Sequence, residues 1–314
     1  MSFMEIKNLC VHYPIRGGFL NKVVDQVYAV DGISMAFETG KTYGLVGESG
    51  CGKSTTGKAI IGLEKIASGS ITYEGQDVTN QRRQRNSSYN RDVQMIFQDS
   101  HSSMNPRKRV LDIIAEPIRN FTTMTPDEEN RRVNELLAIV GMPEDAKYKY
   151  PHQFSGGQRQ RLGIARAVAC KPKLIIADEP VSALDLSVQA QVLNFMQDIQ
   201  DEYGLSYLFI SHDLGVVKHM CDDIAIMYRG RFVERGTSKD IYTNPQHIYT
   251  HRLLSAIPNT EPSTRKERRD ERLRVEQLYR EEQHKYYDKD GKVYPIRPLT
   301  NTHHVAILPT GEER

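Results

Sequence analysis

The feature that most constrains this 314-residue chain is the stretch 47–54, which matches the phosphate-binding pattern G-x-x-x-x-G-K-[ST] at every specified position. An apolar run at 41–46 predicts a buried strand leading into this loop, and residues 53–61 predict the helix that follows it. The glycines allow backbone amides to turn towards a triphosphate. Lys53 offers a cation to its terminal oxygens, and the Ser54 hydroxyl can ligate magnesium. The sequence therefore predicts an α/β fold built around a nucleotide.

Bulk properties exclude several classes of protein. The net charge is only +2, which argues against a nucleic-acid partner. The four cysteines contain no C-x-x-C pair, so we expect a reducing compartment such as the cytoplasm, and neither a disulfide framework nor a zinc site. No apolar run approaches the roughly 18 residues that a membrane span needs. Any contact with a membrane is expected to be peripheral.

The N-terminal region alternates in the manner of antiparallel strands over residues 4–13 and 33–37, and these strands are expected to fold over the phosphate loop. Residues 14–26, with proline, paired glycine and mixed charge, predict a loop insertion between them. Tyr13 and Tyr28 are then candidates to stack on a purine, although a tyrosine that simply packs on a sheet explains either one alone.

The middle of the chain begins with a loop and a strand and then becomes helical. Residues 81–91 predict a solvated basic loop, and 92–97 predict a strand that ends at Gln98. From about 110 to 169 the pattern has helical spacing, and Thr125 followed by Pro126 is typical of a helix start. Ser155 is placed to cap a further helix, whose N-terminus would be a second anion site.

The apolar run 174–178 predicts a central parallel strand that ends in the adjacent carboxylates Asp178 and Glu179. Ligands of open α/β sheets bind at the carboxyl ends of the strands, so Asp178 is expected near the magnesium of the phosphate loop. Without that loop, a turn or a helix cap would be the better explanation of this pair. A buried strand at 207–210 ends at His212, which by itself is no more than a structural histidine. Residues 224–234 predict a closing hairpin.

Taken together, these motifs resemble the ATP-binding subunits of ABC transporters over roughly residues 3–258. The resemblance makes Gln98 the Q-loop glutamine, Glu179 the catalytic glutamate and His212 the switch histidine. Nucleotide contacts are expected from Gly47, Glu48, Ser49, Gly50, Cys51, Gly52, Lys53, Ser54, Thr55 and Tyr13, and magnesium contacts from Ser54, Gln98 and Asp178. The signature is Ser155, Gly156, Gly157 and Gln158, acting on the ATP of a partner subunit, and the D-loop is Ser182, Ala183, Leu184 and Asp185.

Several stretches look like the oligopeptide and dipeptide importers within that superfamily, and specifically like their F-type ATPase subunit: 95–99, 103–107, 150–154, 244–250 and 253–258. The resemblance implies ATP and Mg²⁺ as cofactors and a position on the cytoplasmic face of the cell membrane. It also implies a second, non-identical ATPase subunit, two membrane permease subunits and, indirectly, an extracellular peptide-binding protein. Phe154, Ser100 and Ile248 depart mildly from the family pattern. No cysteine cluster follows residue 258, so no iron-sulfur cluster is expected.

The predicted architecture is an α/β P-loop NTPase core of RecA-like type, with an N-terminal antiparallel β subdomain and a helical insertion subdomain at about 100–169. The ATPase domain would span 1–258. A charged extension would span 259–314, with a helix at 264–285 opened by a Thr264 capping box, and residues 286–314 have no assignment.

The sequence also argues against three rival functions. A GTPase is disfavoured because no N-K-x-D motif follows the phosphate loop. A soluble ABC ATPase acting on nucleic acid would be expected to carry a coiled-coil insertion, a second cassette or a basic face. A non-catalytic family member would lack Glu179 or His212. Import of nickel or another small solute by the same subfamily is the nearest alternative.

Overall fold

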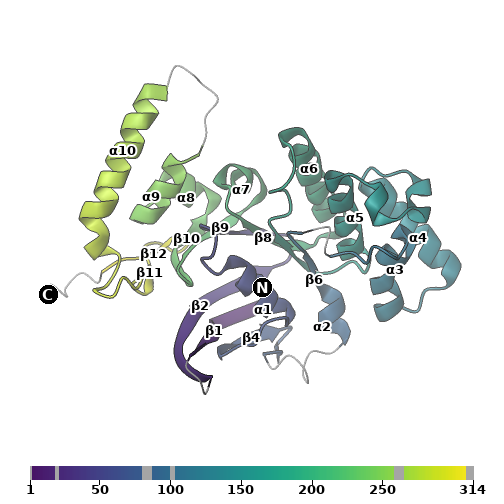
Figure 1. Ribbon diagram of the computed structural model, residues 1–314, viewed down its shortest axis with the longest axis horizontal. Helices are drawn as coiled ribbons and strands as arrows, with labels where there is room; N and C mark the ends of the chain where they lie inside the picture. Colours follow the sequence, from purple (N-terminus) through teal and green to yellow (C-terminus); the bar gives the residue numbers. More distant parts are fainter. Residues whose placement is uncertain (1, 18–20, 80–86, 100–102, 258–264, 309–314) are drawn as a thin grey trace.

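The computed structural model describes residues 2–17, 21–79, 87–99, 103–257 and 265–308. Its strands form two sheets, and Figure 1 shows the N-terminal one below the central one. The N-terminal sheet is antiparallel, in the order β2 (Lys22–Glu38), β1 (Ser2–Gly17), β4 (Ser68–Tyr73) and β5 (Gln76–Asp77). The central sheet has the order β11 (Ile296–Pro298), β12 (His304–Ala306), β10 (Arg231–Thr237), β9 (Asp223–Tyr228), β3 (Thr42–Val46), β8 (Ser206–Ser211), β7 (Leu174–Asp178) and β6 (Val93–Ile96).

The register of the parallel strands brings the predicted site residues to one edge of the central sheet. Strands β9, β3, β8, β7 and β6 are mutually parallel, while β10, β12 and β11 continue the sheet as antiparallel strands. Val46 pairs with Ser211, and Asp178 pairs with Ile210. The segments that follow β3, β6, β7 and β8 therefore leave the sheet at the same end, which is where ligands of such sheets bind.

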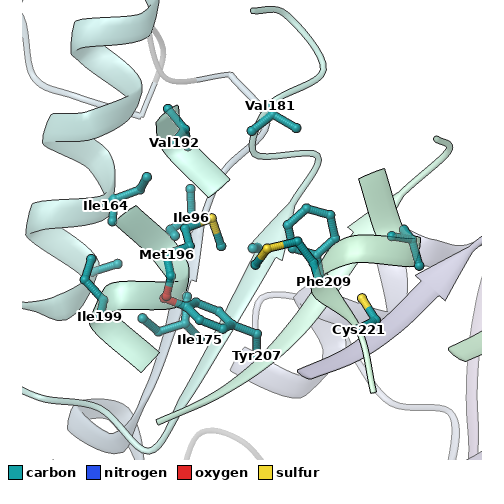
Figure 2. Close-up of a cluster of buried hydrophobic side chains, with 14 of the residues drawn as sticks. Ile96, Ile164, Ile175, Val181, Val192, Met196, Ile199, Tyr207, Phe209 and Cys221 are labelled. Carbon is teal, nitrogen blue, oxygen red and sulfur yellow. The ribbon is translucent and has the colours of Figure 1, made fainter. Parts of the chain in front are cut away.

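The core lies on both faces of the parallel strands. On one face, Ile175, Tyr207 and Phe209 pack among side chains of the neighbouring helices (Figure 2). On the other face, Ile176 and Ile210 pack towards the phosphate-loop helix and the N-terminal sheet. All five side chains are completely buried. Full burial of a side chain of this size contributes about 1.5–3 kcal/mol, which explains why the strands read as continuous apolar runs.

Helices enclose the sheet and form a cluster at one end of the molecule. Figure 1 shows α3, α4 and α5 gathered at one end and α10 at the other. The α-helices are α1 (Lys53–Ile61), α2 (Ser87–Asp92), α3 (Val110–Phe121), α4 (Pro126–Ile139), α5 (Gly156–Val168), α6 (Leu186–Tyr203), α7 (Leu214–Met220), α8 (Ser238–Thr243), α9 (Ile248–Ser255) and α10 (Arg265–Glu282). The 3-10 helices are η1 (Glu144–Tyr148), η2 (Pro151–Gln153) and η4 (Gln283–Lys285).

The predicted helix starts are confirmed where the structure describes them. Thr125 caps α4 in a capping box with Glu128, and Ser155 caps α5 in a capping box with Gln158. The proposed Thr264 cap of α10 lies outside the described residues. Each such box satisfies amides that the first helical turn leaves without partners.

Two loop predictions were wrong. Within residues 14–26, Pro14 pairs with Gln26 and Ile15 with Asp25, so β1 and β2 continue as a long hairpin instead of a loop. This part of the hairpin is mostly exposed, with Val24 at 65% of its accessible surface. Because neither face is buried, the apolar alternation that marks a strand is missing there. The basic segment 81–91 was predicted as a loop, but its end belongs to α2; its residues 81–86 lie outside the described part of the chain.

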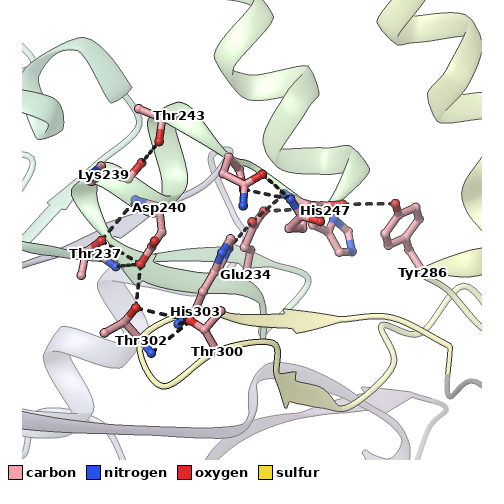
Figure 3. A network of polar contacts seen from close by, with 12 residues as sticks. Glu234, Thr237, Lys239, Asp240, Thr243, His247, Tyr286, Thr300, Thr302 and His303 are labelled. Atoms are coloured by element: carbon pink, nitrogen blue, oxygen red, sulfur yellow. Dashed lines mark hydrogen bonds and ion pairs between the residues drawn. The ribbon is translucent and has the colours of Figure 1, made fainter.

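Residues 286–308, which the sequence left unassigned, form a segment that packs on the core. Strand β12 pairs with β10, and β11 pairs with β12, so the segment extends the central sheet. Glu234 on β10 is fully buried and accepts hydrogen bonds from His303 Nε2 at 2.7 Å and from the amides of Gln246 and His247 at 2.7 and 3.0 Å (Figure 3). These partners satisfy a carboxyl group that would otherwise be costly to bury.

Candidate active site

The phosphate loop runs from the end of β3 to α1 and is packed tightly from behind. A Cβ placed on Gly47 would lie 2.2 Å from the carbonyl oxygen of Met227, so only glycine fits there. Gly50 differs, because its φ is +81° and a Cβ on it would meet nothing within 4 Å. The loop thus needs one glycine for space and another for a left-handed backbone.

We expect Gly47→Ala to lower the free energy of unfolding by about 3 kcal/mol, because β9 or the loop itself must move to relieve the overlap. Gly50→Ala is the matched control, and its left-handed backbone should cost about 1 kcal/mol. Urea unfolding of both variants measures the difference. Equal costs for the two substitutions would contradict the steric role given to Gly47.

Lys53 places its ammonium group inside the loop. The side chain is only 4% exposed, and Nζ donates to the carbonyl oxygens of Gly47 at 2.7 Å and Glu48 at 2.9 Å. A lysine at the start of a helix adds a point charge to the favourable field of the helix N-terminus. This arrangement suits an anion such as a phosphate group.

Ser54 and Asp178 form a pair of oxygen donors beside the loop. The Ser54 hydroxyl donates to Asp178 Oδ1 at 2.8 Å, although the two residues are 124 positions apart. Asp178 is 3% exposed. Burial raises the pKa of the Asp178 carboxyl, and the negative charge of Glu179 raises it further. The hydrogen bond from Ser54 lowers this pKa and so offsets part of the rise. A hydroxyl and a carboxylate are the hard ligands that Mg²⁺ prefers, so these two residues could hold the metal.

Glu179 is held by two side chains that the sequence had singled out. Gln98 Nε2 donates to Glu179 Oε2 at 2.8 Å, and His212 Nδ1 lies 3.1 Å from Oε1. The backbone of Glu179 has a φ of +47°, which is uncommon outside glycine. The Ser182 amide and hydroxyl bond to its carbonyl oxygen at 3.3 and 3.1 Å. The carboxylate is thereby fixed at the edge of the sheet in a strained conformation, as is frequent at functional sites.

The signature residues 155–158 lie elsewhere. The structure places them against the D-loop side: a Cβ on Gly157 would lie 2.7 Å from Val188 Cγ1 and 3.8 Å from Leu184 Cδ2. Within the ranges that the structure describes, no hydrogen bond joins the signature to residues 47–55. The hydrogen bonds of the described residues therefore do not link the two groups of predicted nucleotide residues into one network.

Of the two candidate tyrosines, only Tyr13 lies beside the phosphate-loop helix. It hydrogen-bonds the side chains of Glu64 and Thr55; burial raises its pKa, and the bond to Glu64 adds to this. Tyr28 instead packs edge-on against His12, with 4.5 Å between the ring centroids. Both rings are partly open, at 38% and 53% exposure. Tyr13 is thus the better placed of the two to meet a purine.

Sequence reasoning missed one residue that contacts the loop. The Tyr249 hydroxyl accepts a hydrogen bond from the Glu48 amide at 3.1 Å. The two residues are 201 positions apart, and no motif spacing connects them. The sequence marked residues 244–250 only as a subfamily pattern, so their contact with the loop could not be foreseen.

Two family models match the chain. The model of ABC transporters matches residues 30–182, and the model of the oligopeptide/dipeptide transporter C-terminal region matches residues 233–294. The chain is also 59% identical over 311 residues to the oligopeptide transport ATP-binding protein OppF of Lactococcus lactis subsp. lactis (strain IL1403); the match covers 99% of this chain and 98% of the relative. The chain belongs to the ABC transporter family. Within it, the chain falls among the ATP-binding subunits of the oligopeptide/dipeptide group, as its motifs predicted.

Other ABC proteins support the same placement. The dipeptide transport ATP-binding protein DppF of Escherichia coli (strain K12) is 47% identical over 265 residues, which is 84% of this chain and 79% of the relative. A solved dimeric ATP-binding cassette in a post-hydrolysis state with ADP and Pi has a TM-score of 0.67 at 25% identity, covering 75% of this chain and 98% of its own. The predicted P-loop NTPase fold is confirmed, and the chain is an ABC ATPase whose fold binds nucleotide.

Proposed function

We propose that the chain is the ATP-hydrolysing subunit of an importer, and couples ATP binding and hydrolysis to the uptake of oligopeptides or dipeptides. The observation that carries this proposal is the likeness to oligopeptide transport ATP-binding proteins over nearly the whole chain, including the C-terminal region at residues 233–294. In the structure, that C-terminal region packs on the nucleotide core. The likeness therefore covers an integral part of the molecule.

Each side chain at the sheet edge has a proposed role. Lys53 and Ser54 hold the β- and γ-phosphates, with Tyr13 against the adenine. Bound Mg²⁺, held by Ser54, Asp178 and the Gln98 amide, would neutralise phosphate charge. Glu179 accepts a hydrogen bond from the attacking water and polarises it. Phosphoryl transfer depends mostly on such positioning and charge neutralisation.

Gln98 and His212 contact the two carboxylate oxygens of Glu179. A shift of either side chain when the γ-phosphate binds or leaves would therefore move the Glu179 carboxylate. Gln98 also begins the segment that leads to the helices α3–α5. We propose that this segment moves when the nucleotide site closes and transmits that movement to the membrane partners. Hydrolysis and transport would then depend on each other.

The nucleotide site is proposed to be completed by a second ATPase subunit. Residues 155–158 lie beside the D-loop, and their role in this proposal is to meet the ATP of a partner. Leu186, directly after the D-loop, is 85% exposed, which is a large apolar exposure for a helix start. From the subfamily likeness, we propose a non-identical partner.

The membrane partners are proposed to be two permease subunits, served by an extracellular peptide-binding protein, with this chain at the cytoplasmic face. Across the described residues, none of the helices is both long and apolar enough to cross a bilayer. Attachment of this chain to the membrane would then depend on those partners.

Purification of the chain from its own membrane in mild detergent tests this proposal. We expect two integral membrane proteins and a second ATPase to remain attached. Deletion of the chain should abolish uptake of a labelled oligopeptide, and uptake of a free amino acid serves as the control. Normal oligopeptide uptake in the deletion strain would refute the proposal.

A further inference from the structure

Tyr249 connects the C-terminal segment, which comprises residues 244–257 and 265–308, to the phosphate loop. Its side chain is completely buried, and its hydroxyl accepts the hydrogen bond from the Glu48 amide at 3.1 Å. Lys53 donates to the Glu48 carbonyl oxygen at 2.9 Å. Residue 48 is thus held on its amide by Tyr249 and on its carbonyl by Lys53. The contact is part-buried, and an amide that loses its acceptor there loses stabilisation, so we expect the loop conformation to depend on this hydroxyl.

The start of α9 fixes the position of Tyr249. His247 Nδ1 accepts from the Tyr249 amide at 3.1 Å, and the His247 amide donates to the buried Glu234 at 3.0 Å (Figure 3). Burial lowers the pKa of His247 to about 3, so the ring is neutral and its Nδ1 is available as an acceptor. The tyrosine is therefore anchored through β10 and cannot shift independently of it.

An unbroken series of aromatic contacts leads from Tyr249 to the far helix. The ring of Tyr249 lies 4.7 Å from that of Tyr228, which lies 5.4 Å from that of Tyr287. Tyr287 in turn lies 6.4 Å from Tyr279 on α10. These centroid distances are within the range of favourable ring pairs, so α10 and the segment after it share one packed cluster with the loop contact.

Helices α9 and α10 are also joined by charge. Arg252 pairs with Glu276 at 3.1 Å, and its guanidinium lies 4.9 Å from the centre of the Tyr279 ring. A planar guanidinium can make both contacts at once. The helix that carries Tyr249 is thereby tied to α10 as well as to the core.

We propose that Tyr249 is a positioning residue through which docking of the C-terminal segment sets the affinity of the phosphate loop for nucleotide. The inference rests on the proposed role of residues 47–54 in holding ATP. Coupling of this kind is reciprocal, so ATP must stabilise the docked segment by the same factor as docking strengthens ATP binding. Signals that loosen the segment would then weaken the ATPase without touching its catalytic side chains.

Tyr249→Phe tests the proposal, because it keeps the ring and removes only the acceptor. With full-length protein and Mg-ATP, we expect ATP affinity to fall about fivefold to tenfold, while the maximal rate at saturating ATP changes less than twofold. Tyr242→Phe is the control. It removes a hydroxyl that donates to the Leu214 carbonyl oxygen, outside the contacts that anchor Tyr249, and should leave ATP affinity unchanged.

Hydrogen exchange provides a second measurement. If Tyr249 only supported the fold, its substitution would not change how ATP protects distant amides from exchange. In the wild type and in Tyr242→Phe, ATP should slow amide exchange in α10 and in residues 286–296. In Tyr249→Phe this protection should be lost. Wild-type affinity or undiminished protection in Tyr249→Phe would overturn the inference. Failure of the wild type itself to bind ATP would instead refute the proposed function on which the inference rests.

Discussion

Glu179→Gln is expected to lower ATP hydrolysis in the assembled importer about a thousandfold, while ATP affinity stays near the wild-type value. The amide keeps the shape of the side chain but loses the charge that polarises the attacking water, and loss of a general base costs 10²–10⁴-fold. The amide oxygen can still accept from Gln98, and the amide nitrogen can donate to His212 Nδ1 when that atom carries no proton, so the site should remain folded. Phosphate release and equilibrium ATP binding measure the two quantities.

The same variant should accumulate as a closed pair of ATPase subunits when ATP is added, and oligopeptide uptake should stop. Glu202→Gln is the matched control, because Glu202 is exposed on α6. It should behave as wild type in hydrolysis, pairing and uptake. Uptake close to normal in Glu179→Gln would refute the catalytic role of this carboxylate.

Asp178→Asn should have opposite effects on activity and on stability. Activity should fall by a hundredfold or more, since the proposed metal loses a charged ligand. Stability should rise, because the variant removes a buried charge beside Glu179, while the Asn oxygen can still accept from Ser54. We expect a gain of about 1 kcal/mol, or about 2 °C in Tm, near neutral pH.

The pH dependence of this gain follows from the raised pKa of Asp178. The folded state binds the proton of this carboxyl more tightly than the unfolded chain does. Wild-type stability therefore falls as pH rises from the ordinary aspartate pKa of 3.8 through the raised value, and Asp178→Asn does not share this loss. Calorimetry without nucleotide or metal should show the gain in Tm growing with pH across that window. A variant less stable than wild type at neutral pH would contradict the electrostatic explanation.

Much of the site could be predicted because its motifs follow buried parallel strands. The apolar runs before Gly47, Glu179 and His212 identify three such strands, and the shared edge of a parallel sheet brings the residues after them together. The glycine loop then fixes which edge binds phosphate. Local sequence is sufficient here, because each motif lies within a few residues of the strand that positions it.

The remaining features depend on contacts between distant segments. Tyr249 reaches Glu48 because α9 lies next to the loop, and residues 296–298 and 304–306 become strands because they add to the edge of the sheet at β10. The local sequence pattern of either segment does not reveal these partners. The hairpin residues 14–17 and 21–26 were missed for a different reason: they are largely exposed on both faces, so nothing requires their apolar residues to alternate.

The steady-state ATPase rate of the purified chain, measured alone across a range of concentrations and again within the reconstituted importer, tests the two-subunit site most directly. We expect slow turnover by the dilute isolated chain and a large increase on assembly, because residues 155–158 of one subunit must meet the phosphate loop of another. Rapid turnover by the isolated monomer, unchanged by assembly, would contradict it.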